Sequence, residues 1–306
     1  MSKRLRARTL YSVKHDIKQG INLKKSALME KTPSYRLAFL DHDFLMKEEL
    51  RPVRLQLELL KPEMIQQEQQ IKATIVVFGS ARIQERPVME RKIAALEEAI
   101  RLEPHNHTLG PQLKSLKSLL AKAHYYDEAR HLGRLFSEAT IGEVNLHLVI
   151  VTGGGPGIME AANRGAHDVD AKSIGLTVVL PSEEFPNRYI SPELMFQFHY
   201  FALRKMHFLM RARAMVVFPG GFGTLDELFE TLTLIQQRKI QRIPLVLIGK
   251  SFWEKLINFE MMVEEGLISS QDLHLFKFAE TAKEAYEHVV AFYETNHDDE
   301  HYAEHH

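Results

Sequence analysis

Apolar residues along this chain gather into short continuous runs, separated by segments in which apolar positions recur every three or four residues. The runs are 73–79, 146–151, 173–180, 214–218 and 243–248, with a weaker one at 275–279. Runs of this length are typical of parallel strands buried on both faces. The helical segments between and after them are 125–139, 157–169, 199–213, 225–238, 252–265 and 281–295. This alternation predicts an α/β fold, a doubly wound parallel sheet with helices on both faces.

The first 70 residues do not follow this alternation. They are charged and contain no strand-like run, and Pro52 and Pro62 interrupt a weak helical spacing of leucines between 45 and 59. Proline removes a helical hydrogen bond, so we expect both residues to cut the helix. A weakly amphipathic helix of this size is marginal alone. Residues 1–70 are therefore predicted to be a helical N-terminal extension packed on a main domain at 71–295.

A second departure follows the first strand, where the connection to the next helix is too long for a plain crossover. Helical spacing at 88–103 and 111–122 predicts a helical hairpin inserted at about 84–122. The tail, 296–306, is rich in His, Asp and Glu. We expect it to be frayed, and adventitious metal binding there is favoured over a metal site.

Composition narrows the possible partners. Lys and Arg number 39 against 40 Asp and Glu, so no overall field favours nucleic acid or an anionic membrane. There is no cysteine, which excludes disulfides and thiolate chemistry. No apolar run approaches the roughly 20 residues that span a bilayer, and the basic start lacks the apolar stretch of a signal peptide. The expectation is a cytoplasmic protein.

Candidate chemistry is concentrated in residues 215–230. An apolar run ends at Pro219, three glycines follow at Gly220, Gly221 and Gly223, and a helix is predicted to begin at Thr224 with acids in its first turn. A strand, a tight glycine loop and a helix N-terminus present free backbone N–H groups to an anion. Glycine also allows a phosphate to approach the backbone closely.

Two further loops leave predicted strands in the same way. Residues 151–160 contain Gly153, Gly154 and Gly155, and Gly79 and Ser80 follow the first strand. Ligands bind outside the carboxyl ends of parallel strands, so these loops are expected to share one pocket. Neither glycine loop matches Gly-x-Gly-x-x-Gly or Gly-x-x-x-x-Gly-Lys-Ser/Thr, which argues against a dehydrogenase and against a triphosphate-hydrolysing loop. A nucleoside monophosphate is the better candidate.

The helix at 199–213 places Arg204, His207 and Arg211 on one face. Arginine suits bidentate recognition of phosphate or carboxylate, so Arg204 and Arg211 are candidates for anion binding. Such arginines are often simply solvated, and His207 is expected to be a packing or surface residue. Phe201 and Phe208 are expected to lie in the core.

Four segments together resemble the LOG ("Lonely Guy") family, long mislabelled as lysine decarboxylases. Phe218-Pro-Gly-Gly-Phe-Gly-Thr-Leu-Asp-Glu227 is similar to its Pro-Gly-Gly-x-Gly-Thr-x-x-Glu signature. Arg204-Lys205 is similar to its upstream Arg-Lys pair, residues 153–159 to its Gly-Gly-Gly-x-Gly-x-Met loop, and Gly79-Ser80 to the Gly-Ser after its first strand. The segments occur in family order, so the resemblance covers about 73–295.

This resemblance implies a Rossmann-like fold, a homodimer, and cleavage of the N-glycosidic bond of nucleoside 5'-monophosphates, such as AMP or a cytokinin ribotide, to free base and ribose 5-phosphate. It implies no metal or other cofactor. By position it makes Glu227 and Arg204 the catalytic pair. The residues implied to bind substrate or its phosphate are Gly220, Gly221, Gly223, Thr224, Ser80, Gly79, Gly154, Gly155 and Lys205. The extension and the insert depart from the short plant-type pattern, which leaves base preference open.

Three alternatives stand beside this interpretation. Thr224 to Glu227 also form a capping-box pattern, in which Glu227 would contribute about 1 kcal/mol to helix stability and nothing to catalysis. The loop at 153–157 is alternatively only a tight strand–helix junction, although the nucleotide role is favoured. The protein is alternatively a nucleotide- or cofactor-binding carrier or sensor without turnover. The old decarboxylase label is disfavoured, since no segment suggests a lysine site for pyridoxal phosphate.

Overall fold

The computed structural model describes residues 33–139, 147–179 and 185–295 of the chain. The expectations for 296–306 and for the first 32 residues lie outside them. The chain divides into two compact units, Met1–Leu57 and Glu58–His306. In the first unit the described residues form η1 (Pro33–Tyr35), η2 (Ala38–Leu40), α3 (His42–Leu45), η3 (Glu48–Leu50) and the beginning of α4 (Arg51–Glu68).

The expectation that prolines cut this helix is wrong, because α4 is continuous from Arg51 to Glu68. Pro52 lies at its second residue, where the missing N–H would have no helical acceptor in any case. Pro62 lies inside the helix and is buried. Its packing offsets the hydrogen bond that the ring removes.

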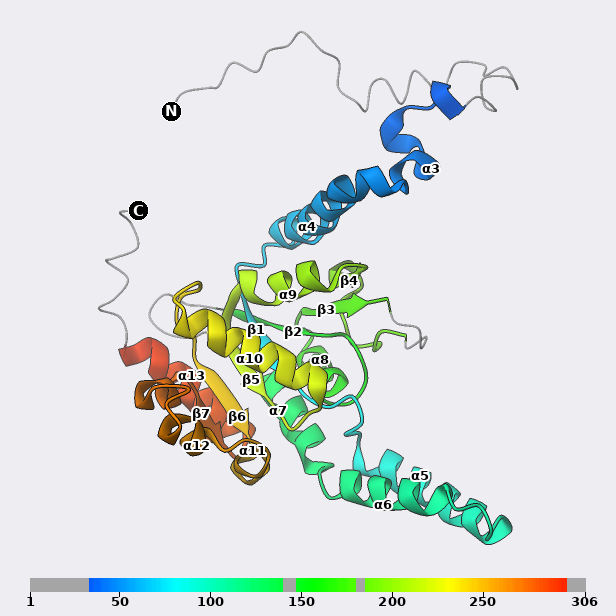
Figure 1. Ribbon diagram of the computed structural model, residues 1–306, viewed down its shortest axis with the longest axis vertical. Helices are drawn as coiled ribbons and strands as arrows, with labels where there is room; N and C mark the ends of the chain where they lie inside the picture. Colours follow the sequence, from blue (N-terminus) through cyan, green and yellow to red (C-terminus); the bar gives the residue numbers. More distant parts are fainter. Residues whose placement is uncertain (1–32, 140–146, 180–184, 296–306) are drawn as a thin grey trace. The chain divides into compact units, whose positions relative to one another are not determined.

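The second unit is built on one parallel sheet of seven strands, in the order β4-β3-β2-β1-β5-β6-β7 (Figure 1). The strands are β1 (Ala73–Phe78), β2 (Leu148–Thr152), β3 (Ser173–Val178), β4 (Met195–Phe198), β5 (Ala212–Val217), β6 (Leu245–Ile248) and β7 (Lys277–Ala279). Every residue of β1, β2 and β6 is buried, as the continuous apolar runs predict. The Rossmann-like, doubly wound α/β fold is confirmed.

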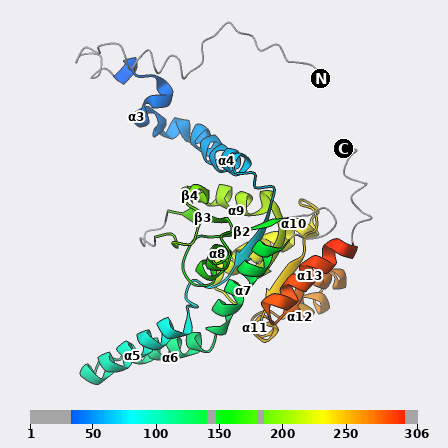
Figure 2. The same ribbon diagram turned by 180° about the vertical axis from the view of Figure 1, so that it is seen from behind.

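Helices cover both faces of the sheet. The longer ones are α7 (His124–Glu138), α8 (Ile158–His167), α9 (Phe201–Met210), α10 (Phe222–Gln236) and α13 (Ala282–Thr295). Helices α9 and α10 lie over the face turned to the viewer in Figure 1, and α7, α8 and α13 lie over the other face, seen in Figure 2. The predicted helix at 252–265 is two helices, α11 (Lys250–Leu256) and α12 (Phe259–Glu264), followed by η5 (Ser270–Leu275). The break is at Asn258, whose side chain accepts a hydrogen bond from the Met261 amide and begins α12.

The predicted insert is present as two helices after β1. They are α5 (Arg86–Leu102) and α6 (Leu109–Leu120), joined across their surfaces by a Lys117–Glu97 ion pair at 2.8 Å. The carboxylate of Glu85, just before α5, accepts a hydrogen bond from Arg164 of α8 at 2.5 Å. The insert therefore begins at an ionic contact between Glu85 and α8, the helix that follows the glycine loop at 153–157.

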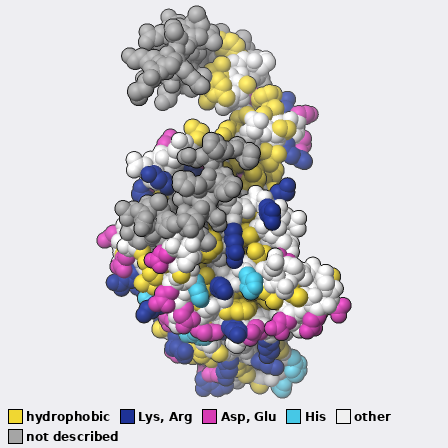
Figure 3. Space-filling model, turned by 90° about the vertical axis from the view of Figure 1, so that its left-hand side faces the viewer, with side chains coloured by type: hydrophobic (Ala, Val, Ile, Leu, Met, Phe, Trp, Pro, Cys, Tyr) yellow, Lys and Arg dark blue, Asp and Glu magenta, His cyan; other side chains and the backbone are white. Residues whose placement is uncertain are grey.

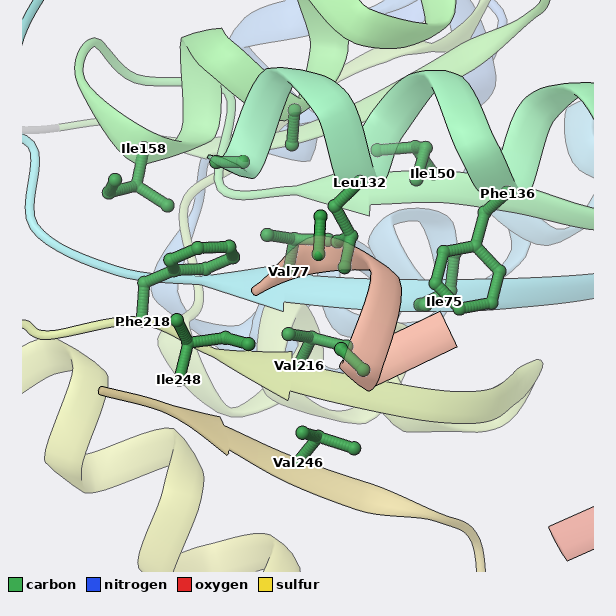
Figure 4. Packing of buried hydrophobic residues seen from close by; sticks show 14 of the residues in the cluster. Ile75, Val77, Leu132, Phe136, Ile150, Ile158, Val216, Phe218, Val246 and Ile248 are labelled. Atoms are coloured by element: carbon green, nitrogen blue, oxygen red, sulfur yellow. The ribbon is translucent and has the colours of Figure 1, made fainter. Parts of the chain in front are cut away.

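The core lies between the sheet and the α7, α8 and α13 layer. Figure 4 shows Ile75 and Val77 of β1 and Val216 of β5 beside Leu132 and Phe136 of α7. All five side chains are fully or almost fully buried. A methylene removed from such a close-packed layer costs about 1 kcal/mol, so this layer holds the strand ends in place.

One strand was not predicted. β4 has only four residues, lies at the edge of the sheet, and alternates exposed and buried positions after the short helix η4 (Pro192–Leu194). It therefore lacks the continuous apolar run by which the other strands were recognised.

The face shown in Figure 3 does not carry one dominant sign of charge. Figure 3 shows Lys and Arg side chains interspersed with Asp and Glu over one face. Among the described residues, no helix is long and apolar enough to cross a membrane. In the same residues, no three His, Cys, Asp or Glu side chains are grouped so that they could hold a metal ion.

Candidate active site

Three loops meet at the carboxyl ends of β1, β2 and β5. The strand order runs from β1 to β4 on one side and from β5 to β7 on the other, so β1 and β5 flank the point at which the order reverses. Open α/β sheets bind ligands at this point. A cavity of about 550 Å³ lies there, lined by Phe78, Gly79, Ser80, Ala81, Arg82, Gly153, Met159, Phe201, Arg204, Gly221, Phe222, Gly223, Thr224, Asp226 and Glu227.

The N-terminal end of α10 forms one wall of this cavity. The helix begins at Phe222 with Gly221 as its N-cap, and no side chain caps it. Its first backbone hydrogen bond runs from the Leu225 amide to the Gly221 carbonyl at 3.0 Å. The amides of Phe222, Gly223 and Thr224 are therefore the unpaired donors that every helix start leaves, and all three residues line the cavity.

The capping-box alternative is wrong for Thr224. This residue is the third of α10 rather than its cap, because the helix begins two residues earlier than the sequence predicted. Its side chain fills the space beside Gly220, where an added Cβ would lie 2.1 Å from the Thr224 hydroxyl oxygen. Gly220 thus permits the tight approach of the loop to the helix, while Gly221 and Gly223 face open space.

Glu227 lies one turn deeper in α10 than these amides. Its side chain is only 6% exposed, and no described residue donates a hydrogen bond to its carboxylate. Burial raises the pKa of Glu227 to about 7, aided by Glu230 and Asp226, while Lys205 and Arg204 oppose the rise. A carboxyl without hydrogen-bond partners that is half-ionised near neutrality is typical of a functional site.

Arg204 of α9 is held against the same cavity. Its Nε donates a hydrogen bond to the Leu176 carbonyl at 2.7 Å, and its guanidinium lies over the Phe208 ring at 5.1 Å. A Cβ on Gly153 would approach its Nη2 to 2.7 Å, so this glycine makes room for the guanidinium. Burial lowers the pKa of Arg204, and Glu227 is its principal electrostatic partner. The structure thus brings the two predicted catalytic residues together.

Gly153 of the glycine loop at 153–157 and Met159 of α8 line the cavity, while Gly154 and Gly155 do not. The amide of Gly154 donates to the Thr152 hydroxyl at 3.0 Å, and Nδ2 of Asn187 donates to the carbonyls of Gly154 and Gly155 at 3.2 and 3.1 Å. Gly154 also has φ +76°, which a residue with a Cβ rarely adopts. These two glycines shape the loop rather than line the cavity.

The loop after β1 is tied to the other two. The Ser80 amide donates to the Pro219 carbonyl at 3.0 Å, and the Ile158 amide donates to the Ser80 carbonyl at 3.2 Å. A Cβ on Gly79 would lie 2.6 Å from the Ile158 side chain. Ser80 therefore connects the first strand with both glycine loops, and its hydroxyl accepts a hydrogen bond from the Arg82 amide at 3.1 Å.

Lys205 and Arg211 do not line the cavity. The Lys205 ammonium pairs with Asp226 at 2.9 Å and with Glu230 at 2.8 Å, which joins α9 to α10. Arg211 forms a bidentate pair with Glu63 of α4. The expectation that Arg211 binds an anionic ligand is therefore wrong, because its guanidinium already has a carboxylate partner.

Phe201 corrects a further expectation. It was predicted to be a core residue, yet its side chain is 51% exposed and lines the cavity. Phe208, by contrast, is fully buried against Phe78, with ring centroids 4.8 Å apart. The sequence pattern alone could not separate the two rings, because both residues fall in the same predicted helix at 199–213.

Comparison with known proteins is consistent with this geometry. The model of a family described as "Possible lysine decarboxylase" matches residues 159–289. Cytokinin riboside 5'-monophosphate phosphoribohydrolase LOG4 of Arabidopsis thaliana is 31% identical over 168 residues, which cover 53% of this chain and 73% of that protein. The corresponding LOG of Oryza sativa subsp. japonica is 30% identical over 168 residues, 53% of this chain and 65% of that protein.

This chain belongs to the LOG family. A solved structure of the molybdenum cofactor binding protein from Rippkaea orientalis is similar over 55% of this chain and 87% of its own, with a TM-score of 0.39 and 18% identity. The family's relatives are named as enzymes that act on nucleotides, and the cavity of this chain is formed by the segments that resemble the family's motifs.

The buried carboxyl of Glu227 leads to a prediction about how the stability of the protein depends on pH. The raised pKa means that the unfolded chain, with a pKa near 4.5, loses this proton before the folded chain does. The contribution of Glu227 to stability is thus fully present below pH 4.5 and is lost as the pH rises to about 7. The substitution Glu227→Gln removes this loss, so we expect the variant to be up to about 3 kcal/mol more stable than the parent at pH 8.

Urea unfolding at pH 5 and pH 8 measures this difference. The gain in the free energy of unfolding should shrink at pH 5, where most of the folded parent retains the proton. Glu264→Gln, at an exposed position on α12, is the control and should change stability little at either pH. An equal gain for Glu227→Gln at both pH values would show that the carboxyl is not held protonated by burial.

Proposed function

We propose that this protein is an N-glycosidase that hydrolyses nucleoside 5'-monophosphates to a free base and ribose 5-phosphate. The observation that carries the proposal is the placement of a buried, hydrogen-bond-free carboxyl one turn behind three unpaired helix amides in a single cavity. AMP-like nucleotides and cytokinin ribotides are the proposed substrates, which is consistent with the names of the relatives.

The phosphate binds at the start of α10. Unpaired N–H groups and the positive end of the helix dipole together favour a phosphate dianion. The proposed donors are the amides of Phe222, Gly223 and Thr224, with the Thr224 hydroxyl beside them. Binding energy from this group, which does not react, fixes the position of the ribose.

The ribose then lies beside Glu227. As the C1'–N bond breaks, the electron pair leaves with the base, and positive charge develops on the ribose ring. The ionised carboxylate of Glu227 stabilises this charge, and water supplies hydroxide to C1' while a proton goes to the base. Lys205 and Arg204 keep part of Glu227 ionised at neutral pH, because their charges lower the pKa that burial raises. The two cations therefore favour the carboxylate form that the mechanism requires.

The decarboxylase name of the matched family model receives no support from the cavity. Of the described residues that line it, none is a lysine. Lys205, the lysine next to Arg204 in sequence, is not in the lining, and its ammonium pairs with Asp226 and Glu230. A Schiff-base lysine is the residue that pyridoxal phosphate requires.

Incubation of the purified protein with AMP tests the proposal. We expect release of adenine and ribose 5-phosphate, measured by chromatography and a reducing-sugar assay, and no release from adenosine at the same concentration. Tight AMP binding without product would instead support the alternative, a nucleotide carrier or sensor.

We also propose a homodimer formed through α9 and α10. Met206 and Met210 of α9 and Phe222 and Phe229 of α10 expose large apolar side chains, and a groove of about 380 Å³ lies between the two helices. Apolar groups gathered on one face of a protein mark interaction surfaces. Light scattering should report twice the 35.3 kDa chain mass, and a monomer at micromolar concentration would contradict the proposal.

A further inference from the structure

Of the described residues in the cavity lining, three are phenylalanines: Phe78 is buried against Phe208, Phe222 is 92% exposed, and Phe201 is half exposed. Phosphate and ribose binding leaves the ring of Phe201 without a role. Phe201, the first residue of α9, lines the cavity with half of its side chain exposed. Its ring lies 5.8 Å from the guanidinium carbon of Arg204, the electrostatic partner of Glu227. The ring is thus next to the groups assigned to the sugar, on the side of the cavity formed by α9.

The start of α9 is held in place before any ligand binds. The carboxylate of Glu58 accepts hydrogen bonds from the amides of His199 and Tyr200 at 2.9 and 3.1 Å. These are the two residues that precede Phe201. Nε of Arg204, one helical turn further on, is fixed on the Leu176 carbonyl. Phe201 is therefore an exposed ring on a rigid support, which limits the entropy lost when a flat ligand packs on it.

Among the described residues, the polar side chains left in the cavity to read the edge of a base are Arg82, which only donates, and the Ser80 hydroxyl. The carboxylate of Asp226 pairs with Lys205, and the Ser80 hydroxyl accepts the Arg82 amide. Of the described residues in the lining, none is an Asn or Gln, the side chains that pair with base edges through both a donor and an acceptor. Stacking on an aromatic face, by contrast, suits every base.

We propose that Phe201 is the platform on which the base of the bound nucleotide stacks. This inference rests on the proposed function for the position of the ribose. It adds the residue that holds the base. The ring contacts the leaving group and takes no part in proton transfer.

Binding measurements with ligands that contain a base, and with one that lacks it, test the inference. In a Glu227→Gln background, which keeps nucleotides intact, Phe201→Leu should weaken binding of AMP, GMP, CMP and UMP each by about tenfold. Affinity for ribose 5-phosphate, which has no base to stack, should change less than twofold. Phe201→Tyr, which keeps the ring, should restore nucleotide affinity.

The control is Phe39→Leu, since Phe39 of η2 is 49% exposed, close to the exposure of Phe201, and is not among the residues that line the cavity. It should change nucleotide binding less than twofold. The inference is overturned if Phe201→Leu leaves all four nucleotides unaffected, weakens ribose 5-phosphate equally, or affects a single base. Turnover of AMP by the parent protein is measured in parallel. If Phe201→Leu weakens nucleotide binding but the parent protein does not turn over AMP, the proposed hydrolysis is rejected and the platform is kept. If Phe201→Leu leaves AMP turnover unchanged, the platform alone is rejected.

Discussion

Replacement of Glu227 by Gln is expected to lower kcat for AMP hydrolysis by about 10³-fold while AMP binding changes little. The amide keeps the size of the side chain but cannot carry the negative charge that offsets an oxocarbenium-like transition state. Electrostatic groups of this kind typically contribute two to three powers of ten. The phosphate amides of α10 are untouched, so a kcat effect without a matching change in Kd is the expected pattern.

Asp226→Asn is the matched control for this substitution. Asp226 is the residue before Glu227 and lines the same cavity, and its substitution by Asn also removes a negative charge. Unlike Glu227, Asp226 is exposed and already pairs with Lys205. We expect its kcat to fall less than tenfold, since a solvated, paired carboxylate contributes little. Turnover by Glu227→Gln equal to that of the parent would remove Glu227 from the chemistry.

The pH profile gives a second measure of the same group. With a pKa of about 7, Glu227 is mostly protonated at pH 6 and mostly ionised at pH 8. If the ionised form is the active one, kcat/KM rises with pH across this interval. The same ionisation destabilises the folded chain, so activity and stability respond to pH in opposite directions. In the proposed mechanism, this opposition follows from the burial of the carboxylate that stabilises the positive charge on the ribose.

The parallel sheet could be predicted from sequence because buried parallel strands are apolar at every position. β1, with six consecutive buried residues, is the clearest case. β4 was missed because an edge strand of four residues alternates exposed and buried side chains. The helices were found where their apolar stripe is regular. They were misjudged where a single polar residue, such as Asn258, begins a new helix.

The candidate site was predictable to the extent that it depends on local backbone. Gly220 and Gly153 are needed because neighbouring side chains, Thr224 and Arg204, occupy the space of a Cβ. Glycines required for this reason recur at a fixed spacing, which can be recognised in the sequence. The partner of a charged residue cannot be recognised in this way. Arg211 meets Glu63, which lies 148 residues earlier in the chain, and only the folded structure shows that this arginine is already paired.

The substitution Gly220→Ala is expected to reduce kcat/KM for AMP by about 10²-fold. The new methyl group would lie 2.1 Å from the hydroxyl oxygen of Thr224 and 2.5 Å from its Cβ, so the loop or the first turn of α10 must move. A shift of about 1 Å in a group that positions the substrate costs roughly this much. Steady-state kinetics with AMP measures the loss.

Two comparisons separate the proposed phosphate role from general damage. Gly110→Ala, in α6, places its methyl group in open space and should leave kinetics unchanged. The rate with adenosine, which lacks the phosphate, should be equally low in the parent and in Gly220→Ala. If Gly220→Ala loses stability in urea but keeps its AMP kinetics, the loop serves only the fold. A loss confined to phosphorylated substrates instead identifies the start of α10 as the anchor, because only a ligand that uses those amides is sensitive to their displacement.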